Sequence, residues 1–141
     1  MYRNELSGTL AGLLRVRMLS MNDAHVYCTL DQVASEVRSN VRMAQEYYET
    51  FGFDDYDFRL SLWDPDNKDK YIDQPENWEA TQNHLREIMD GLGVEYTEAV
   101  GEAAFYGPKI DIQFRTALGR EESMSTIQLD FAAKERFGLS Y

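Results

Sequence analysis

Residues 110–131, IDIQFRTALGREESMSTIQLDF, carry the clearest strand pattern in the chain. Apolar residues alternate with polar ones up to a turn near Leu118-Gly119, and alternate again on the way back. Because successive side chains of a strand point to opposite faces, this pattern predicts two strands that each bury one face. The stretch therefore predicts a β-hairpin. Its buried positions would be Ile110, Ile112, Phe114, Ile127, Leu129 and Phe131.

Upstream of the hairpin, the spacing of apolar residues predicts a helix and a strand. Thr29 and Gln32 form a T-x-x-Q capping box, and Gly52 is suited to end the helix that follows. Residues 56–62 alternate as a half-buried strand would. The apolar helix positions recur at spacings of three and four, and they are Val33, Val37, Val41, Ala44, Tyr48 and Phe51.

A second helix is expected from Pro75 to Gly91 or Gly93, and its buried face would hold Trp78, Leu85, Ile88, Met89 and Leu92. His84 of this helix is expected on the surface. At the other end of the chain, residues 2–6 read as a short strand, 7–13 as a loop, and 14–28 as a longer extended segment. Hairpin, helix, strand, helix and hairpin predict an α+β fold, with an antiparallel-rich sheet and helices packed on one face.

Composition narrows the class of protein. The chain has 141 residues, 43% of them hydrophobic, with nine Tyr, seven Phe and two Trp, which suits one folded domain rather than a disordered chain. A single cysteine excludes an internal disulfide, and no apolar run reaches the length of a membrane span. The net charge of −11 opposes non-specific binding to DNA. A soluble, cytoplasmic protein is expected.

The first twenty residues depart from this acidic balance, with Arg3, Arg15 and Arg17 against the single acid Glu5. Residues two apart share a strand face, so paired strands here would gather arginines on one surface. Guanidinium groups suit phosphate oxygens, and such a patch suits one bound polyphosphate. A cross-strand ladder of salt bridges, or scattered surface arginines, remains an alternative.

Several segments resemble a known family. YRNELSG (residues 2–8), RVR (15–17) and NDAHVYC (22–28) resemble the second signature motif of class II aminoacyl-tRNA synthetases, in the form typical of threonyl-tRNA synthetases. GEAAFYGPKIDI (101–112) and STIQLDF (125–131) follow in the same order as in that family. The resemblance covers the whole chain, and implies that residues 1–141 are part of a catalytic domain, from the second motif to the segment before the third.

The resemblance also implies a reaction. Threonine and ATP form threonyl-adenylate, and the threonyl group passes to the 3′ end of tRNA(Thr). Arg3 would bind the α-phosphate, Glu5 the adenine, and Arg15 the γ-phosphate, with Mg²⁺ accompanying ATP. Residues 7–13 would meet the acceptor end of the tRNA. The parent protein would be a homodimer.

For the amino acid, the resemblance implies that Asp23 holds the amino group, that Tyr106 and Gln128 line the pocket, and that Lys109 lies near the reacting groups. His25 would be one of three protein ligands of a zinc ion that tells threonine from valine, which an apolar pocket separates poorly. Cys28 does not match a ligand position. Without the resemblance, His25 would read as a structural histidine. With one ligand of three, we expect the isolated chain to bind no zinc tightly and to have negligible activity.

The chain departs from the commonest family pattern at four positions, Leu19, Met21, Asn22 and Ser123. These substitutions indicate a divergent subgroup. Two other interpretations remain: a non-catalytic, synthetase-like binding or regulatory module, and another class II synthetase of the prolyl or seryl kind.

Overall fold

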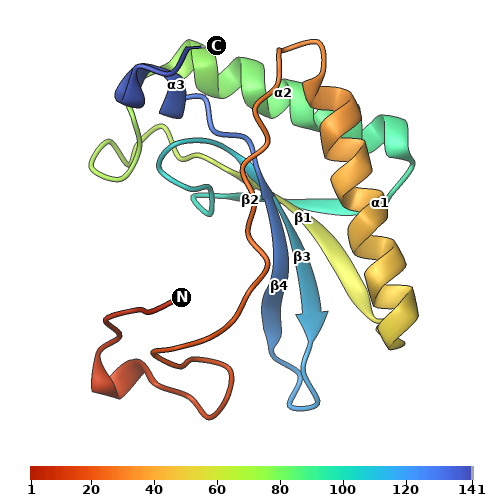
Figure 1. The fold of residues 1–141 in the computed structure, drawn as a ribbon. Helices are drawn as coiled ribbons and strands as arrows, with labels where there is room; N and C mark the ends of the chain where they lie inside the picture. The colour runs from red at the N-terminus through yellow and green to blue at the C-terminus, as the bar shows by residue number, and fades with distance from the viewer. Residues whose placement is uncertain (141) are drawn as a thin grey trace.

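A computed structural model describes residues 1–140. Two long helices lie against a small sheet (Figure 1). This is an α+β fold, as predicted. In chain order the elements are η1 (Ser7–Thr9, a 3-10 turn), α1 (Val33–Phe51), β1 (Tyr56–Leu62), α2 (Pro75–Leu92), β2 (Tyr96–Val100), β3 (Lys109–Arg115), β4 (Glu121–Gln128) and α3 (Ala133–Phe137).

The sheet has the strand order β2-β1-β3-β4. The predicted hairpin is confirmed as β3 and β4, which pair antiparallel, and β3 also pairs antiparallel with β1. The sequence pattern did not predict β2, which pairs parallel with β1 and makes the sheet mixed. The register between β3 and β4 shifts between Ile112 and Gln113. Because β4 ends at Gln128, Leu129 and Phe131 lie just beyond the strand in which the alternation placed them.

The helix ends follow local signals closely. Pro75 occupies the first turn of α2, and Gly93 ends that helix with a φ of 67°. Gly52 ends α1 with a φ of 71°, and the Phe53 N–H donates to the Tyr48 carbonyl at 2.8 Å, a usual helix-ending arrangement. The predicted start of α2 and the predicted C-terminal ends of both helices are confirmed.

The predicted capping box forms only in part. The Thr29 N–H donates to Gln32 Oε1 at 3.0 Å, but the Gln32 N–H donates to the Thr29 carbonyl oxygen rather than to the side chain. The helix consequently begins one turn later, at Val33. Phe51, which the spacing placed on the buried face, is exposed at the end of α1.

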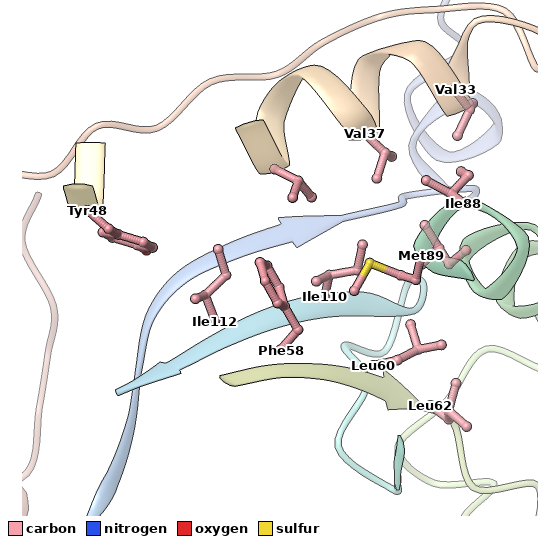
Figure 2. Packing of buried hydrophobic residues seen from close by; sticks show 12 residues of the cluster. Val33, Val37, Tyr48, Phe58, Leu60, Leu62, Ile88, Met89, Ile110 and Ile112 are labelled. Atoms are coloured by element: carbon pink, nitrogen blue, oxygen red, sulfur yellow. The ribbon is translucent and has the colours of Figure 1, made fainter. Parts of the chain in front are cut away.

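The core lies between one face of the sheet and the helices α1 and α2 (Figure 2). Figure 2 shows valines of α1 and residues of α2 pointing toward the apolar side chains of β1 and β3. The buried residues of this cluster are Val33, Val37, Val41, Tyr48, Phe58, Leu60, Leu62, Leu85, Ile88, Met89, Ile110 and Ile112. The members of this cluster on β1 and β3 take every second position of each strand. The side chains between them point to the other face of the sheet, and they are polar.

A close backbone approach fixes the turn before β3. A Cβ added to Gly107 would lie 1.8 Å from the Leu129 carbonyl oxygen, so only glycine fits there. The Leu129 N–H donates to the Pro108 carbonyl at 3.0 Å. These contacts bring Tyr106 beside the end of β4.

The N-terminal strands predicted over residues 2–6 and 14–28 are not formed as strands. The two segments meet at an isolated bridge between Tyr2 and Met18, and a second bridge joins Ala11 to Arg15. Before Val33 no residue is buried, and only Glu5, Val16 and Leu19 are half-buried. The segments are extended and touch each other without joining the sheet. In the described part of the chain, no helix combines the length and apolar character needed to cross a bilayer.

Candidate active site on the polar face of the sheet

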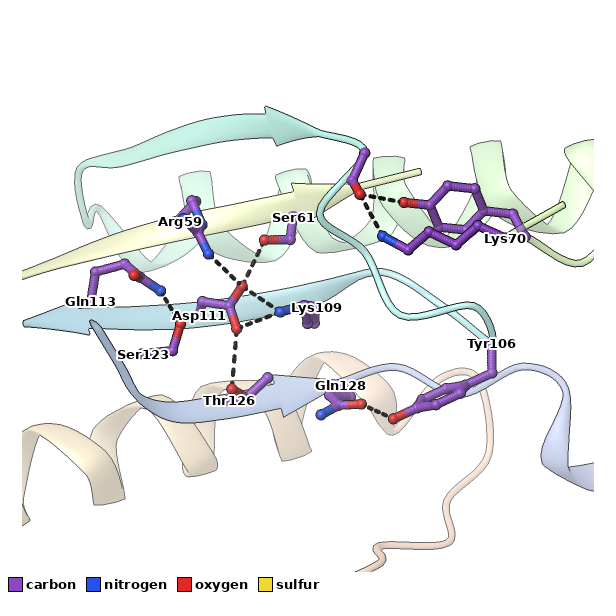
Figure 3. Close-up of polar contacts among 12 residues, drawn as sticks. Arg59, Ser61, Lys70, Tyr106, Lys109, Asp111, Gln113, Ser123, Thr126 and Gln128 are labelled. Atoms are coloured by element: carbon purple, nitrogen blue, oxygen red, sulfur yellow. Dashed lines mark hydrogen bonds and ion pairs between the residues drawn. The ribbon is translucent and has the colours of Figure 1, made fainter. Parts of the chain in front are cut away.

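The side of the sheet that faces away from α1 and α2 carries polar residues in matched rows (Figure 3). Opposite Asp111 of β3 stand Arg59 of β1 and Thr126 of β4, and opposite Lys109 stand Ser61 and Gln128. Further along the sheet, the Gln113 amide donates to the Ser123 hydroxyl. We call this set the polar face: Arg59, Ser61, Lys109, Asp111, Gln113, Ser123, Thr126 and Gln128.

Asp111 is the centre of the polar face. Its side chain is 0% exposed, and it accepts from the Ser61 hydroxyl at 2.7 Å and the Thr126 hydroxyl at 3.1 Å. Lys109 Nζ contacts both carboxylate oxygens, at 2.9 and 2.8 Å, and Arg59 Nη2 lies 3.4 Å from one of them. A buried carboxylate needs such partners, because an unpaired buried charge is costly.

These contacts set the protonation of Asp111. Burial by itself would raise the pKa of its carboxyl group. The hydrogen bonds from Lys109, Ser61 and Thr126, with the positive charge of Lys109, outweigh burial and leave the pKa of Asp111 below its ordinary value. The group is therefore an anion at neutral pH, between the two cations Arg59 and Lys109. The two cations and one anion leave the polar face with one positive charge in excess. In addition, Arg59 Nε is buried without a hydrogen-bond partner among the described residues.

Two of the three residues assigned to threonine binding, Tyr106 and Gln128, contact each other at the end of this face. The Tyr106 hydroxyl donates to Gln128 Oε1. Burial raises the pKa of Tyr106, and the negative charges of Asp130 and Asp23 raise it further. Asp23, Tyr106 and Gln128 are far apart in the sequence, and Lys109 is the direct cross-strand neighbour of Gln128.

The three residues assigned to ATP lie in the N-terminal segment, which Figure 1 shows to one side of the sheet. Arg15 Nη2 lies 3.2 Å from Glu5 Oε2, and Arg17 Nε donates to the Glu5 carbonyl at 3.2 Å. The Arg3 N–H donates to the Arg17 carbonyl at 2.9 Å. The Arg15–Glu5 pair is one rung of the salt-bridge ladder that the sequence left open, whereas Arg3 forms no ion pair with any described residue.

The ring of His25 is exposed and makes no hydrogen bond to a described residue, which is not how a buried structural histidine behaves. Cys28 is exposed and free. Among residues 1–140, no three His, Cys, Asp or Glu side chains are close enough together to hold a metal ion. The described residues therefore offer His25 as a single ligand and do not form a zinc site by themselves. His84, expected on the surface, is half-buried in α2, and its shielded Nε2 has no hydrogen-bond partner in the part of the chain that the structure describes.

Sequence reasoning missed Arg59, Ser61, Asp111 and Thr126 as members of the site. The signal was present in the strand pattern, since Arg59, Ser61 and Asp111 alternate with buried apolar residues of β1 and β3, and Thr126 directly precedes Ile127 in β4. Alternation was used only to find the core. Among the positions that depart from the family pattern, Met21 and Asn22 are exposed and Leu19 is half-buried.

Comparison with known proteins identifies the class. A family model described as the tRNA synthetase class II core domain (G, H, P, S and T) matches residues 1–141. The chain belongs to this family of class II tRNA synthetase core domains.

Within that family, the similar proteins are threonine–tRNA ligases. That of Geobacillus sp. (strain WCH70) is 56% identical over 141 residues, and threonine–tRNA ligase 1 of Bacillus subtilis (strain 168) is 52% identical over the same length. The crystal structure of the RNA binding domain of threonyl-tRNA synthetase from Cryptosporidium parvum Iowa II has a TM-score of 0.89 and 38% identity, and it covers 100% of this chain and 34% of that one. The resemblance found in the sequence is thereby confirmed. The chain spans 22% of the length of both ligases.

Proposed function

We propose that this chain is a segment of a threonine–tRNA ligase that carries part of its active site. The proposed reaction joins threonine to AMP from ATP and then transfers it to the 3′ end of tRNA(Thr). The observation that carries the proposal is the contact of Tyr106 with Gln128, the cross-strand neighbour of Lys109, at one end of the polar face. It is supported by the identity of 52–56% to threonine–tRNA ligases. A cytoplasmic homodimer belongs to the same proposal.

On the amino-acid side, the carboxylate of Asp23 receives the amino group of threonine, while Tyr106 and Gln128 line its side chain. Tyr106 and Gln128 hold each other in place by their hydrogen bond, so the pocket wall is pre-ordered. Lys109 presents a cation toward the reacting carboxylate and phosphate. Positioned charge of this kind is the main requirement of a reaction in which phosphate oxygens gain negative charge.

On the nucleotide side, Arg3 binds the α-phosphate, Glu5 the adenine and Arg15 the γ-phosphate, and Mg²⁺ comes with ATP. Arg3 has no acid partner among residues 1–140, which supports this role because its guanidinium is available to an anion. Glu5 and Arg15 must exchange their mutual ion pair for contacts with the nucleotide. That pair is partly exposed, so its loss costs little. The loop that contains η1 is exposed and is assigned to the acceptor end of the tRNA.

The proposal includes a zinc ion, for which the described residues supply one candidate ligand, His25. The exposed imidazole can serve as one ligand, and the remaining ligands must come from outside the described residues. When bound, zinc would supply a Lewis acid for the amino and hydroxyl groups of threonine.

The experiment is threonine-dependent exchange of pyrophosphate into ATP by the full-length protein that contains this chain. Replacing Arg3 by alanine should lower the exchange rate about 10²–10³-fold, the usual effect of losing one preorganised donor to the transition state. Arg120→Ala is the matched control, because Arg120 is an exposed arginine of the β3–β4 turn without a side-chain partner among the described residues. Exchange by Arg3→Ala at the rate of the control would reject the assignment. A folded wild-type protein without any exchange would instead favour a non-catalytic module.

A further inference from the structure

Of the cations assigned to the proposed site, Lys109 is the one that lies on the sheet. Its side chain is paired with a carboxylate. Its ammonium group contacts both oxygens of Asp111, at 2.9 and 2.8 Å. Lys109 and Asp111 are two residues apart on β3, so their side chains leave the same face of the strand. The side chain of Lys109 is 19% exposed. The Lys109 end of the ion pair is therefore open to a ligand, whereas the Asp111 end, which is buried, is closed.

The closed end is fixed from several directions. Ser61 of β1 and Thr126 of β4 donate to Asp111 from opposite sides, and Arg59 approaches from the strand opposite (Figure 3). A carboxylate with donors on both sides cannot rotate without losing one of them. Asp111 therefore gives Lys109 an anchor whose position is set by three strands. A lysine side chain has four rotatable bonds, and its position otherwise is poorly defined.

Charge on the polar face points to the same role. Arg59 and Lys109 supply two positive charges near one another, and Asp111 supplies the single negative charge between them. With Asp111 present, the two cations can lie close together and leave one positive charge for an anionic ligand. Without it they would repel each other, and the flexible Lys109 would turn toward solvent.

We propose that Asp111 is a positioning residue that acts through Lys109, by holding its ammonium group at the end of the polar face beside Gln128. The inference rests on the proposed function, because it assigns Lys109 to the reacting groups. Asp111 itself has no exposed surface and does not touch the substrate.

A double-mutant cycle in the full-length protein tests this link. Asp111→Asn should lower threonine-dependent pyrophosphate exchange about 10²-fold, the effect of a small misplacement of a reacting group. In the background of Lys109→Met, the same change should alter the rate by less than about 2-fold, because no ammonium group remains to be positioned. An equal loss in both backgrounds would mean a structural role and would overturn the proposal. Asp57→Asn is the matched control, since Asp57 is a 73% exposed carboxylate on the same face of β1.

If Asp111→Asn does not fold, Asp111→Glu replaces it in the cycle. Glutamate keeps the negative charge but moves it by one methylene group, so it should lower exchange in the wild-type background and not in the Lys109→Met background. No loss in the wild-type background would also overturn the proposal.

A second measurement does not depend on activity. Acetic anhydride labels exposed lysines, and mass spectrometry compares Lys109 with Lys68, an exposed lysine that makes no ion pair with a described residue. Release from Asp111 should make Lys109 label faster relative to Lys68 in Asp111→Asn, and leave the ratio unchanged in Asp57→Asn. An unchanged ratio in Asp111→Asn would overturn the proposal. If the wild-type protein shows no exchange, the proposed function fails, while the labelling result still decides whether Asp111 holds Lys109.

Discussion

At the scale of single residues, Asp111 shows how one polar side chain can organise a sheet face. It sits in a strand between Ile110 and Ile112, which are both fully buried in the apolar core on the opposite side. Neither neighbour can shift without opening the core, so the backbone holds the carboxylate in place. The contacts with Ser61, Thr126 and Lys109 then define its direction. An accurately placed charge follows from ordinary strand alternation.

The protonation of Asp111 should be visible in stability. Because its folded-state pKa lies below the ordinary value of about 3.9, the carboxylate stabilises the fold above that value, and this contribution is lost as the pH falls through the folded-state pKa. Asp111→Asn should lower the free energy of unfolding of the 141-residue chain by about 1.5–3 kcal/mol at pH 7, as expected for a hydrogen bond to a charged group. The difference from wild type should shrink toward pH 2. Urea denaturation at a series of pH values measures it.

The exposed Asp57 gives the comparison for this measurement. Its ion pair with Arg115 is 4.0 Å long and open to solvent, so Asp57→Asn should change the free energy of unfolding by less than about 0.5 kcal/mol at either pH. If Asp111→Asn lost the same free energy at pH 7 and pH 2, the destabilisation would come from packing and not from the charge.

At the scale of the elements, the C-terminal end of α2 holds two glycines whose replacement by alanine should have opposite effects. Gly91 lies inside the helix, and the nearest atom to an added Cβ would be Arg38 Nη2 at 3.8 Å, an ordinary contact. Gly91→Ala should therefore raise the free energy of unfolding by about 0.5–1 kcal/mol. Gly93 has a φ of 67°, so Gly93→Ala should lower it by about 1–2 kcal/mol although the space is open. Chemical denaturation of both variants measures the contrast, and a loss of stability in Gly91→Ala would contradict it.

The elements also show where sequence patterns succeed. Both long helices and the strands β1, β3 and β4 follow from periodicity and from Pro75, Gly52 and Gly93, because these signals are local. Strand β2 was missed because it is short, lies at the edge of the sheet, and has no strict alternation of buried and exposed residues. The segments 2–6 and 14–28 were expected as strands because their residues favour extended backbone. A strand also needs a hydrogen-bonding partner along its length, and here the pairing stops at single bridges.

The residues of the candidate site likewise fall into two groups, those that the sequence predicted and those that it did not. The resemblance named Asp23, Tyr106, Gln128 and Lys109, and the fold brings the last three together around the end of β4. Periodicity could not give this grouping, because it depends on the strand order and on the close approach at Gly107. Arg59, Ser61 and Thr126 could have been proposed from alternation alone, once the sheet was known to have a polar face.

At the scale of the whole molecule, burial is distributed unevenly. The core and the polar face belong to residues 33–132, whereas the segment before Val33 contains no buried residue. Large apolar side chains are nevertheless present in that segment, and Leu6, Leu13, Leu14, Tyr27 and Leu30 are among its most exposed. Regions with few buried contacts open most easily. The N-terminal segment should therefore be the least stable part of the isolated chain.

Limited proteolysis tests this expectation. Trypsin should cut the isolated chain first after Arg15 or Arg17, and leave the helices and the sheet intact for longer, because its sites there lie in paired or helical backbone. In the full-length protein the same cleavage should be slower, since exposed apolar side chains of this number are usually covered by other surfaces. Arg15→Gln combined with Arg17→Gln removes these trypsin sites, while chymotrypsin should still cut the segment near Leu13 or Tyr27. A first cut within α1 or the sheet would show that stability is distributed differently from burial.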